Sequence, residues 1–368
     1  RLIKTFLPEE RGFFMEKFMA EAIRLAKKYR GRTSPNPMVG AIVVKEGIIV
    51  GRGAHKRAGL AHAEVEALNQ AGKKAEGATL YVNLEPCSHF GKTPPCTDLI
   101  IRSKISHVVT AIEDPNPLVG GKGHSILQKN GIKVTTGILK KEAEKLNEIF
   151  LKNMRTKQPF AILKSAITLD GKIATKVGSS KWITNSKSRE RVHRIRSEVD
   201  AILVGKNTLM IDNPRLNVRL KNIEKNPFKI VISNSFNFDK IIKTNVYKLS
   251  SKEQLILCTT ENKIDQRFIN DNRIVIVQFD NIQNLMKQLY SIGICSILVE
   301  GGQSTYTSFL KNKLADKIHL FVSNKMIGNE GLGWIGNMAI SEIENAIKLV
   351  DIEFEQIDNN MLITGYLR

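Results

Sequence analysis

The feature that most constrains the fold of this chain is an alternation of short apolar runs with segments of helical spacing. In the first half, strand-like runs rich in β-branched residues cover 79–87, 107–114 and 132–137, and helix-like segments at 97–103 and 123–131 separate them. Such alternation is typical of a layered α/β domain with a largely parallel sheet. The other predicted elements of this half are a helix at 15–29, a hairpin at 39–53 and a helix at 62–72.

The length and a second run of alternating segments predict two domains. At 368 residues the chain exceeds an average single domain, and a charged helical segment at 139–158 ends before Pro159. We therefore expect domains at 15–155 and 159–368, both α/β, and little structure in residues 1–14. Strands of the second half are predicted at 160–171, 201–205, 228–233, 254–260, 273–279, 296–302, 318–323 and 360–368, and helices at 182–200, with Thr184 or Asn185 as N-cap, and at 281–293.

Composition indicates a folded protein of a reducing compartment and leaves the class of partner open. Apolar residues make up 42% of the chain, four cysteines are too few for a disulfide framework, and no apolar run reaches the length of a membrane span. The first residues carry no secretory signal, so a cytoplasmic location is expected. The formal charge of +20 fits nucleic acid, phosphorylated small substrates or a lysine-rich composition alone, and the scattered basic residues favour the last interpretation.

The stretch PCSHFGKTPPC at 86–96 poses a choice between a metal site, a disulfide and two buried thiols. A reducing location argues against the disulfide. His62 opens a predicted helix with the letters HAE, while Cys87 and Cys96 flank the turn after a predicted strand. Imidazole and thiolate are zinc ligands, and three protein ligands leave the fourth position for water. With Glu64 as proton carrier, an H-x-E followed by P-C and a second cysteine is typical of zinc-dependent nucleobase deaminases.

The separation of the two cysteines departs from that pattern. Nucleobase deaminases have two residues between the cysteines, whereas eight separate Cys87 from Cys96. The inserted residues include His89 and Lys92, which are suited to holding an anionic group beside the metal. The glycine and two prolines of the insertion are equally suited to a rigid turn with a solvated Lys92, and the sequence leaves both interpretations open.

A second candidate site lies at 296–310, SILVEGGQSTYTSFL, since the second half has no G-x-G-x-x-G after its first strand. An apolar strand there ends at Glu300, and Gly301 and Gly302 lead into a helix rich in hydroxyl groups. Glycines let a backbone approach phosphate closely, and a helix N-terminus offers free N–H groups to an anion. The pattern predicts a phosphate site, although an ordinary tight turn explains the two glycines equally well.

Five motifs of the first half together resemble the deaminase domain of the bifunctional riboflavin-biosynthesis deaminase–reductase family. They are PNPMVGAIVV, AHKRAG, HAEVEAL, LEPCSHFGKTPPC and DPNPLVGGKG, and the long cysteine separation is normal in that family. The resemblance, from Met15 to Asn153, implies a cytidine-deaminase-like α/β/α fold and a diaminopyrimidinone substrate with a ribosylamine 5′-phosphate. Glu64 would take a proton from a zinc-activated water and pass it to the ring nitrogen and the departing amine. The substrate contacts implied are Asn36, His55, His89, Lys92 and Asn116.

The second half resembles the reductase domain of the same family in KSAITLDGKIA, SKWIT, RSEVDAILVGKNTLMIDNPRLNVR and VEGG. The resemblance runs from Pro159 to the C-terminus and implies a dihydrofolate-reductase-like α/β fold that uses NADPH to reduce the ribosyl group to ribityl. The cofactor residues implied are Ala166, Trp182, Thr208, Asp212, Gly302, Gln303, Ser304, Thr305, Tyr306, Thr307 and Ser308. The substrate residues implied are Lys164, Ser180, Thr184, Arg196, Leu216, Arg219 and Glu300, with the two arginines on the phosphate. Arginines 189, 191 and 194 share the predicted helix of Arg196, so a solvated arginine face is the competing interpretation there.

We expect a bifunctional enzyme that deaminates and then reduces one small phosphorylated pyrimidine, with zinc and NADPH as cofactors. An RNA-editing zinc deaminase with a C-terminal RNA-binding domain is the alternative, and the net charge favours it slightly. A zinc-stabilised binding module is the third reading, and it would need neither Glu64 nor an open zinc position. We further expect a homo-oligomer with no nucleic-acid or membrane partner.

Overall fold

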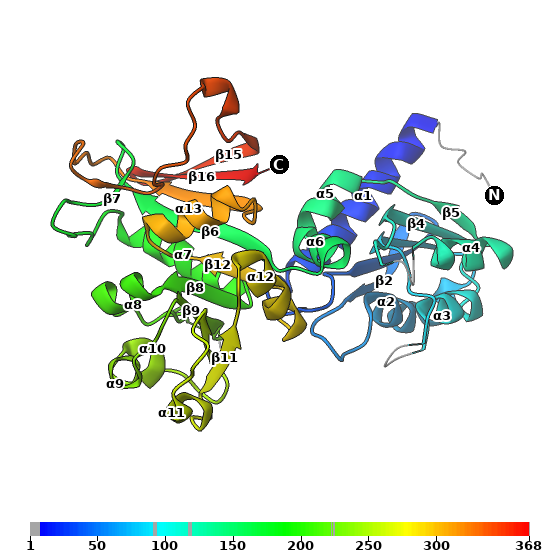
Figure 1. Cartoon of the computed structure of the whole chain (residues 1–368). Coiled ribbons are helices and arrows are strands. Elements are labelled where there is room, and N and C mark those ends of the chain that lie inside the picture. The colour runs from blue at the N-terminus through cyan, green and yellow to red at the C-terminus, as the bar shows by residue number, and fades with distance from the viewer. Residues whose placement is uncertain (1–7, 91–93, 117–119, 222, 224, 368) are drawn as a thin grey trace. The chain divides into compact units, whose positions relative to one another are not determined.

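The computed structural model describes residues 8–90, 94–116, 120–221, 223 and 225–367 (Figure 1). The chain divides into two compact units between Thr156 and Lys157, near the domain boundary predicted before Pro159. Within the described residues, none of the helices combines the length and the apolar character that crossing a membrane requires.

The first unit is built on a five-stranded sheet in the order β2-β1-β3-β4-β5. Its strands are β1 (Gly40–Lys45), β2 (Ile48–Ala54), β3 (Thr79–Leu84), β4 (His107–Ile112) and β5 (Lys133–Thr135). β1 runs antiparallel to β2 and β3, whereas β3, β4 and β5 run parallel to one another. Its helices are α1 (Pro8–Lys27), α2 (Ala63–Ala71), α3 (Cys96–Arg102), α4 (Lys122–Lys129), α5 (Lys140–Leu146) and α6 (Glu148–Thr156), with a 3-10 helix at Gly72–Ala75.

The helices of this unit cover both faces of its sheet (Figure 1). Successive side chains of a strand point to opposite faces. Accordingly, Ala41 and Val43 of β1 belong to the apolar core under α2, α3 and α4, while Ile42 and Val44 belong to the core under α1, α5 and α6. The unit is therefore an α/β/α sandwich, as predicted.

Two predicted helix boundaries in this unit are wrong. The first helix already begins at Pro8, so the expectation of little structure in residues 1–14 fails from that residue on. The helix predicted at 139–158 is divided into α5 and α6 at Asn147. The buried Asn147 amide accepts the backbone N–H of Met38 at 2.8 Å and donates to the Met38 carbonyl at 3.1 Å. This long-range pair of hydrogen bonds lies at the break.

The second unit is built on a nine-stranded sheet in the order β11-β10-β9-β8-β12-β6-β13-β16-β15. Its strands are β6 (Phe160–Ile167), β8 (Ala201–Gly205), β9 (Phe228–Ser233), β10 (Leu255–Thr259), β11 (Ile274–Gln278), β12 (Ser296–Val299), β13 (Lys317–Val322), β15 (Leu349–Ile357) and β16 (Asn360–Leu367), and β7 (Lys172–Ala174) pairs separately with β14 (Leu332–Gly333). The strands from β11 to β13 are parallel, and β16 and β15 continue the sheet antiparallel. Its helices are α7 (Ser186–Glu198), α8 (Lys206–Asp212), α9 (Phe238–Ile241), α10 (Asn245–Lys248), α11 (Gln266–Ile269), α12 (Ile282–Ser291) and α13 (Gln303–Lys311), with a 3-10 helix at Ile343–Asn345.

The start of α7 is fixed by a capping asparagine. Of the two candidates from the sequence, Asn185 is the N-cap, and its side-chain oxygen accepts the backbone N–H of Ser188 at 2.8 Å. The nitrogen of the same amide donates to the carbonyl of Ile357 at 3.0 Å. Asn185 thus caps α7 and joins it to the end of β15.

Gly40 lies in β1 where the backbone of α1 approaches most closely. A Cβ atom there would lie 2.0 Å from the Ala22 carbonyl oxygen and 3.0 Å from the Ala26 nitrogen. We predict that Gly40→Ala destabilises the first unit by about 1–3 kcal/mol, the usual cost of overpacking. Urea unfolding followed by circular dichroism measures this loss, while tryptophan fluorescence reports the second unit alone, because Trp182 and Trp334 both lie in it.

The matched control is Gly12→Ala in α1, where nothing lies within 4 Å of the added Cβ. Alanine is the better helix former by about 1 kcal/mol, so this variant should unfold at a higher urea concentration than the unaltered chain. A Gly40→Ala chain as stable as the unaltered one would show that β1 and α1 are not in this close contact.

Candidate functional site

Three metal-ligating side chains meet beyond the carboxyl end of β3 in the first unit. His62 directly precedes α2, Cys87 follows β3, and Cys96 is the first residue of α3. Their ligand atoms lie within 4.8 Å of one another, and His62 Nδ1 is 3.2 Å from Cys96 Sγ and 3.6 Å from Cys87 Sγ. Tetrahedral zinc with bonds of about 2.1 Å to nitrogen and 2.3 Å to sulfur separates those atoms by about 3.6 Å. The three residues therefore fit zinc.

The charge distribution of this cluster suits a metal. Hydrogen bonding from the Cys96 thiol and then from His62 lowers the pKa of Cys87, so the proton that the two cysteines share stays on Cys96. The Cys96 backbone N–H also donates to Cys87 Sγ at 3.4 Å. Thiolate is the form of cysteine that binds zinc, and metal binding releases the remaining proton.

Glu64 lies in the first turn of α2, is 4% exposed, and lines the same cavity as His62. Burial, with the negative charge of Cys87 as a smaller cause, raises the pKa of its carboxyl group to about 7. A carboxyl group with a pKa near neutrality both takes up and gives up protons at neutral pH. The position and the pKa of Glu64 thus suit general acid–base catalysis beside a metal.

The cluster opens into a cavity of about 400 Å³, within the range of small-molecule sites. Four of the five predicted substrate contacts line it, namely Asn36, His55, His89 and Asn116. The fifth, Lys92, lies outside the described residues. The structure therefore collects residues from four distant segments of the sequence around one space.

His55 and Asn36 orient each other in the cavity wall. His55 Nδ1 lies 3.1 Å from the Ala61 carbonyl oxygen, and His55 Nε2 lies 3.1 Å from Asn36 Nδ2. Burial lowers the pKa of His55, which favours the neutral ring. A neutral ring that donates from Nδ1 accepts at Nε2, so the hydrogen bond fixes the direction of the Asn36 amide.

Two acidic residues of the cavity wall were missed by the sequence analysis. Glu85 follows β3, Asp114 lies just beyond β4, and both line the cavity. Burial raises the pKa of Asp114 to about 6. Ligands of open α/β sheets bind beyond the carboxyl ends of the strands, so acidic residues among the last residues of two predicted strands were the signal that could have found them.

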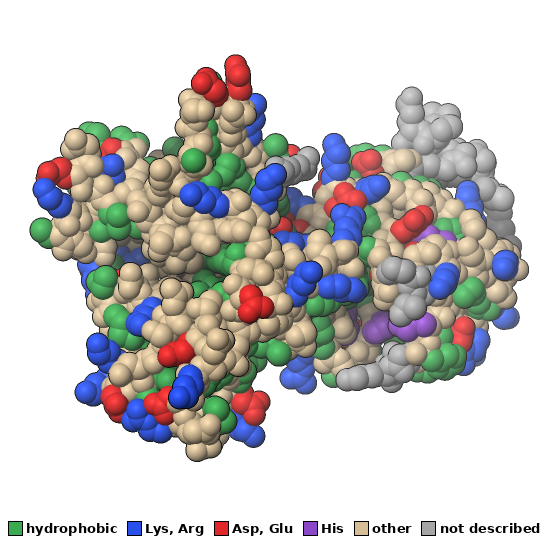
Figure 2. Space-filling view, viewed as in Figure 1, with side chains coloured by type: hydrophobic (Ala, Val, Ile, Leu, Met, Phe, Trp, Pro, Cys, Tyr) green, Lys and Arg blue, Asp and Glu red, His purple; other side chains and the backbone are tan. Residues whose placement is uncertain are grey.

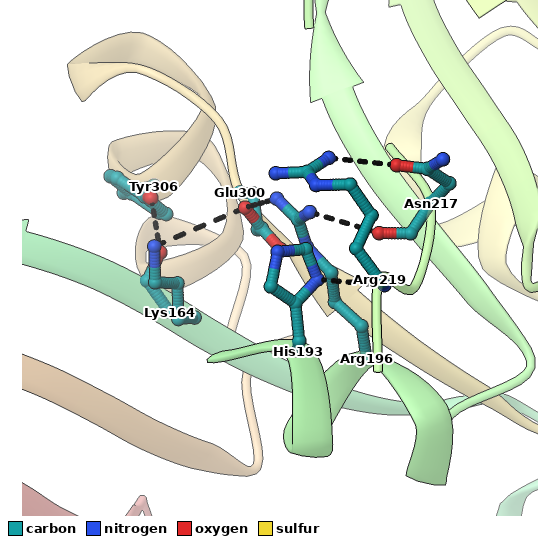
Figure 3. A network of polar contacts seen from close by, with 7 residues as sticks. All are labelled: Lys164, His193, Arg196, Asn217, Arg219, Glu300 and Tyr306. Atoms are coloured by element: carbon teal, nitrogen blue, oxygen red, sulfur yellow. Dashed lines mark hydrogen bonds and ion pairs between the residues drawn. The ribbon is translucent and has the colours of Figure 1, made fainter. Parts of the chain in front are cut away.

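The second unit gathers charged side chains at the carboxyl end of β12 (Figure 3). Glu300 directly follows β12, and its carboxylate accepts from Arg196 Nε at 2.6 Å and from Arg196 Nη2 at 2.8 Å. Lys164 Nζ of β6 lies 3.9 Å from the same carboxylate. Burial acts to raise the pKa of Glu300, but the two cations outweigh it and hold that pKa at about 2. Three predicted substrate residues thus form one buried ionic network.

Arg219 lies beside Arg196 and Asn217 at this network (Figure 3). Its Nη1 donates to the side-chain oxygen of Asn217 at 2.8 Å, and its backbone N–H donates to His193 Nδ1 at 3.4 Å. The backbone carbonyl of Asn217 accepts from Arg196 Nη1 at 3.2 Å. Arg196 is bound along two edges by Glu300 and Asn217, whereas Arg219 is exposed. Of the two arginines expected on the phosphate, Arg219 is the more accessible.

Several predicted cofactor residues collect around the start of α13. A Cβ on Gly301 would lie 2.5 Å from Thr305 Cβ, so this position requires glycine. A Cβ on Gly302 would lie 3.6 Å from Thr208 Oγ1, which places Thr208 beside the turn. Of the other predicted cofactor residues, Gln303, Ser304, Tyr306, Thr307 and Ser308 lie in α13 itself, whereas Ala166 lies in β6 and Asp212 is the last residue of α8. The turn thus combines a close backbone approach with the N-terminus of a nine-residue helix.

Other predicted residues lie apart from this turn in the sequence. Trp182 is 63% exposed, with the Arg189 guanidinium 4.4 Å from its ring centroid and Lys325 Nζ donating to its carbonyl at 2.6 Å. Ser180 and Thr184 flank it on the segment between β7 and α7, and Leu216 is buried. Among the described residues, no hydrogen bond or ring contact joins Trp182 to the glycine turn.

Comparison with known families finds a match for each unit. The model of the cytidine and deoxycytidylate deaminase zinc-binding region matches residues 14–112. The model of the RibD C-terminal domain matches residues 159–363. These matches agree with a zinc-binding deaminase domain in the first unit and a reductase domain in the second.

Relatives and solved structures match over both units. The riboflavin biosynthesis protein RibD of Aquifex aeolicus is 45% identical, over 95% of this chain and 97% of the relative, and that of Bacillus amyloliquefaciens is 43% identical over 85% of each. Acinetobacter baumannii RibD has a TM-score of 0.89 at 33% identity, covering 97% of this chain and 99% of its own. A Thermotoga maritima diaminohydroxyphosphoribosylaminopyrimidine deaminase/5-amino-6-(5-phosphoribosylamino)uracil reductase has a TM-score of 0.84 at 38% identity, covering 97% and 100%.

The buried Arg196–Glu300 pair leads to a prediction about stability. We expect Arg196→Leu to destabilise the second unit by about 3 kcal/mol, because it leaves a buried carboxylate without its main partner. Urea unfolding followed by tryptophan fluorescence measures this. Arg194→Leu is the matched control, since Arg194 pairs with Glu190 in an exposed contact that contributes at most about 1 kcal/mol.

The same pair predicts a pH dependence. The folded pKa of Glu300 is about 2, below its ordinary value of 4.5, so Glu300 stabilises the fold above pH 4.5 and this contribution disappears as the pH falls toward 2. In Arg196→Leu the carboxyl group takes up a proton more readily, so the loss of stability should shrink between pH 7 and pH 5. A loss that stays constant would contradict the prediction that Glu300 of the variant begins to take up a proton within this range.

Proposed function

The chain belongs to the RibD family of riboflavin biosynthesis, a bifunctional deaminase and reductase, and we propose that its two sites act in succession on one pyrimidine ribotide. The observation that carries this proposal is the cavity in which buried Glu64 lies beside three zinc-type ligands. The substrates that we assign are those named for the Thermotoga maritima relative, a diaminohydroxyphosphoribosylaminopyrimidine and the corresponding aminouracil.

The two reactions have a fixed order in this proposal, because the product of the first is the substrate of the second. Deamination adds water to the pyrimidine, releases ammonia and leaves a keto group, which converts the diaminopyrimidinone to an aminouracil. The ribosylamine phosphate is unchanged in this step. Reduction then adds a hydride and a proton to the ribosyl group and gives a ribityl chain.

Proton transfer in the deaminase site is assigned to Glu64. Zinc on the three ligands would lower the pKa of a water in its fourth position and so supply the nucleophile at neutral pH. Glu64 would carry one proton from this water to the ring nitrogen, and a second proton, from the hydroxyl group then attached to the ring carbon, to the departing amine. Its pKa of about 7 suits both directions of transfer. Asn36, His55, His89 and Asn116 are assigned to holding the substrate.

Positioning is the main task of the reductase site. NADPH is the cofactor of the RibD reductase domain and supplies the hydride. The N-terminal N–H groups of α13, with Thr208 beside them, are assigned to its phosphates. Lys164 and Glu300 are assigned to the sugar, and Arg219 to the substrate phosphate, which it can bind with two parallel hydrogen bonds.

Partners other than the substrate are part of the proposal as well. The RNA-binding alternative has no support, because the second half matches a reductase domain. On the face in Figure 2, basic side chains are scattered and mixed with acidic ones, as expected for a chain without a nucleic-acid stripe. We further propose a cytoplasmic homo-oligomer without nucleic-acid partners.

Glu64→Gln tests the assignment of the deaminase site. Glutamine has nearly the same size but carries no exchangeable carboxyl proton, so ammonia release from the diaminopyrimidinone ribotide should fall by at least about a hundred-fold. Zinc content, measured by mass spectrometry, should stay at about one ion per chain, since Glu64 is not a ligand. NADPH oxidation with the already deaminated ribotide should persist.

Glu66→Gln is the matched control, because Glu66 lies in the same turn of α2 as Glu64. Its carboxylate lies 2.8 Å from Lys56 Nζ and pairs with that lysine rather than with a metal ligand. This variant should keep both activities. Loss of both activities in Glu64→Gln, with zinc retained, would show that the two sites are not separate.

Arg219→Ala tests the assignment of the reductase site. It should weaken binding of the deaminated ribotide by about 1.5–3 kcal/mol, the range for a hydrogen bond to a charged group, and leave NADPH binding unchanged. Gly302→Val should do the reverse, because the added side chain closes the backbone approach to the cofactor phosphates. Separate titrations of NADPH and ribotide against each variant measure both effects.

The structure supplies controls for this pair. A Cβ on Gly302 would meet only Thr208 Oγ1, at an ordinary contact distance of 3.6 Å, so the fold tolerates the first added atom. Arg194→Ala removes another exposed arginine of the same unit and should leave both titrations unchanged. If Arg219→Ala loses the cofactor while Gly302→Val loses the ribotide, the two subsites are exchanged.

A further inference from the structure

Glu85 is a buried carboxylate that the proton transfer described above does not use. It directly follows β3, two residues before the ligand Cys87, and its side chain has no exposed surface. A buried carboxylate is costly unless its oxygens are hydrogen-bonded. The partners of Glu85 therefore indicate what the residue does.

Three backbone N–H groups donate to this carboxylate, and all of them come from the segment after β4. Oε2 accepts from Asp114 at 3.2 Å and from Gly121 at 3.0 Å, and Oε1 accepts from His124 at 3.2 Å. Asp114 and Gly121 lie on either side of Asn116 in the sequence. One carboxylate thus binds the chain both before and after Asn116.

The hydrogen bonds continue from Glu85 to the cavity. Asp114 Oδ1 accepts the backbone N–H of Asn116 at 2.8 Å, and the Asn116 carbonyl accepts the backbone N–H of Gly120 at 2.8 Å. Glu85, Asp114 and Asn116 all line the cavity. The position of two cavity side chains therefore depends on the acceptors that Glu85 provides.

The same contact joins this part of the chain to the metal-ligand segment. A Cβ on Gly123 would lie 2.3 Å from the Pro86 carbonyl oxygen and 3.1 Å from Glu85 Oε1, so α4 packs directly on the chain between Glu85 and Cys87. The Cys87 carbonyl in turn accepts the backbone N–H of Thr97 in α3. The Asp114–Asn116 segment is thus linked, through Glu85, to the part of the chain that carries the ligand Cys87.

We propose that Glu85 is the positioning residue that sets the segment bearing Asp114 and Asn116 relative to the metal ligands, and so sets where the pyrimidine lies. This inference rests on the proposed deaminase function. Glu85 transfers no proton in this role. A carboxylate is required because all three partners are donors, and an amide offers only one acceptor atom and turns an N–H₂ group toward an N–H group.

Glu85→Gln is the principal test, measured as ammonia release from the diaminopyrimidinone ribotide. We expect KM to rise at least ten-fold, with a smaller change in kcat, while zinc stays at about one ion per chain and reduction of the deaminated ribotide is unchanged. Glu113→Gln, the same change in the exposed neighbour of Asp114, is the matched control and should have the KM of the unaltered chain.

A double-variant cycle separates positioning from a general structural effect. If Glu85 acts through Asn116, then Glu85→Gln combined with Asn116→Ala should raise KM little more than Asn116→Ala alone, because coupled residues are not additive. Fully additive effects, or an unchanged KM in Glu85→Gln, would overturn the proposal.

Two further outcomes remain decisive. If Glu85→Gln loses zinc or the fold, Glu85→Asp is used, which keeps two acceptor oxygens on a shorter side chain. It should retain zinc and show a raised KM, and an unchanged KM would again overturn the proposal. If the unaltered chain releases no ammonia, the proposed function fails, and this result is distinct from a failure of the role of Glu85.

Discussion

Parallel pairing of neighbouring strands decides where chemistry is possible in both units, because the carboxyl ends of such strands meet at one edge of the sheet. In the first unit β3 and β4 are parallel neighbours, and Glu85 and Asp114, one just beyond each, are hydrogen-bonded to each other. In the second unit β12 lies between β8 and β6, and the Glu300 backbone N–H donates to the Leu203 carbonyl of β8 at 2.8 Å. A shift of one residue in either register would turn these side chains to the opposite face.

The sequence was sufficient for features that depend on residue type and order. The α/β class follows from strand–helix alternation, and the zinc-type cluster follows from the order of His62, Cys87 and Cys96. It was insufficient where a residue acts through a distant partner. Asn147 interrupts a good helical pattern at a pair of hydrogen bonds to Met38, 109 positions away in the chain, which no local pattern contains.

The arginines of α7 show the same limit in the second unit. Spacing leaves a ligand site and a solvated face equally possible, and the structure gives each arginine a different environment. Arg189 stacks on Trp182, Arg191 pairs with Glu355 of β15 at 3.3 Å, and Arg194 pairs with Glu190 in its own helix. Arg196 alone of the four contacts Glu300 in the buried network. Arg191 and Arg196 find their partners in β15 and directly after β12, so for these two arginines the environment depends on strand order rather than on the helix sequence.

The hydrogen bonds between Asn147 and Met38 also limit which fragment of the gene could be transferred to another protein as a working deaminase. The zinc-binding region recognised by sequence comparison ends at residue 112, and it includes every metal ligand. Yet Phe150 of α6 lines the cavity, and both backbone polar groups of Met38, next to β1, are bonded by Asn147. A gene fragment that ended with β4 would transfer the metal ligands without one wall of their cavity. The smallest transferable deaminase unit is therefore longer than its motifs, and recombination within it would separate the metal ligands from Phe150 in the cavity wall.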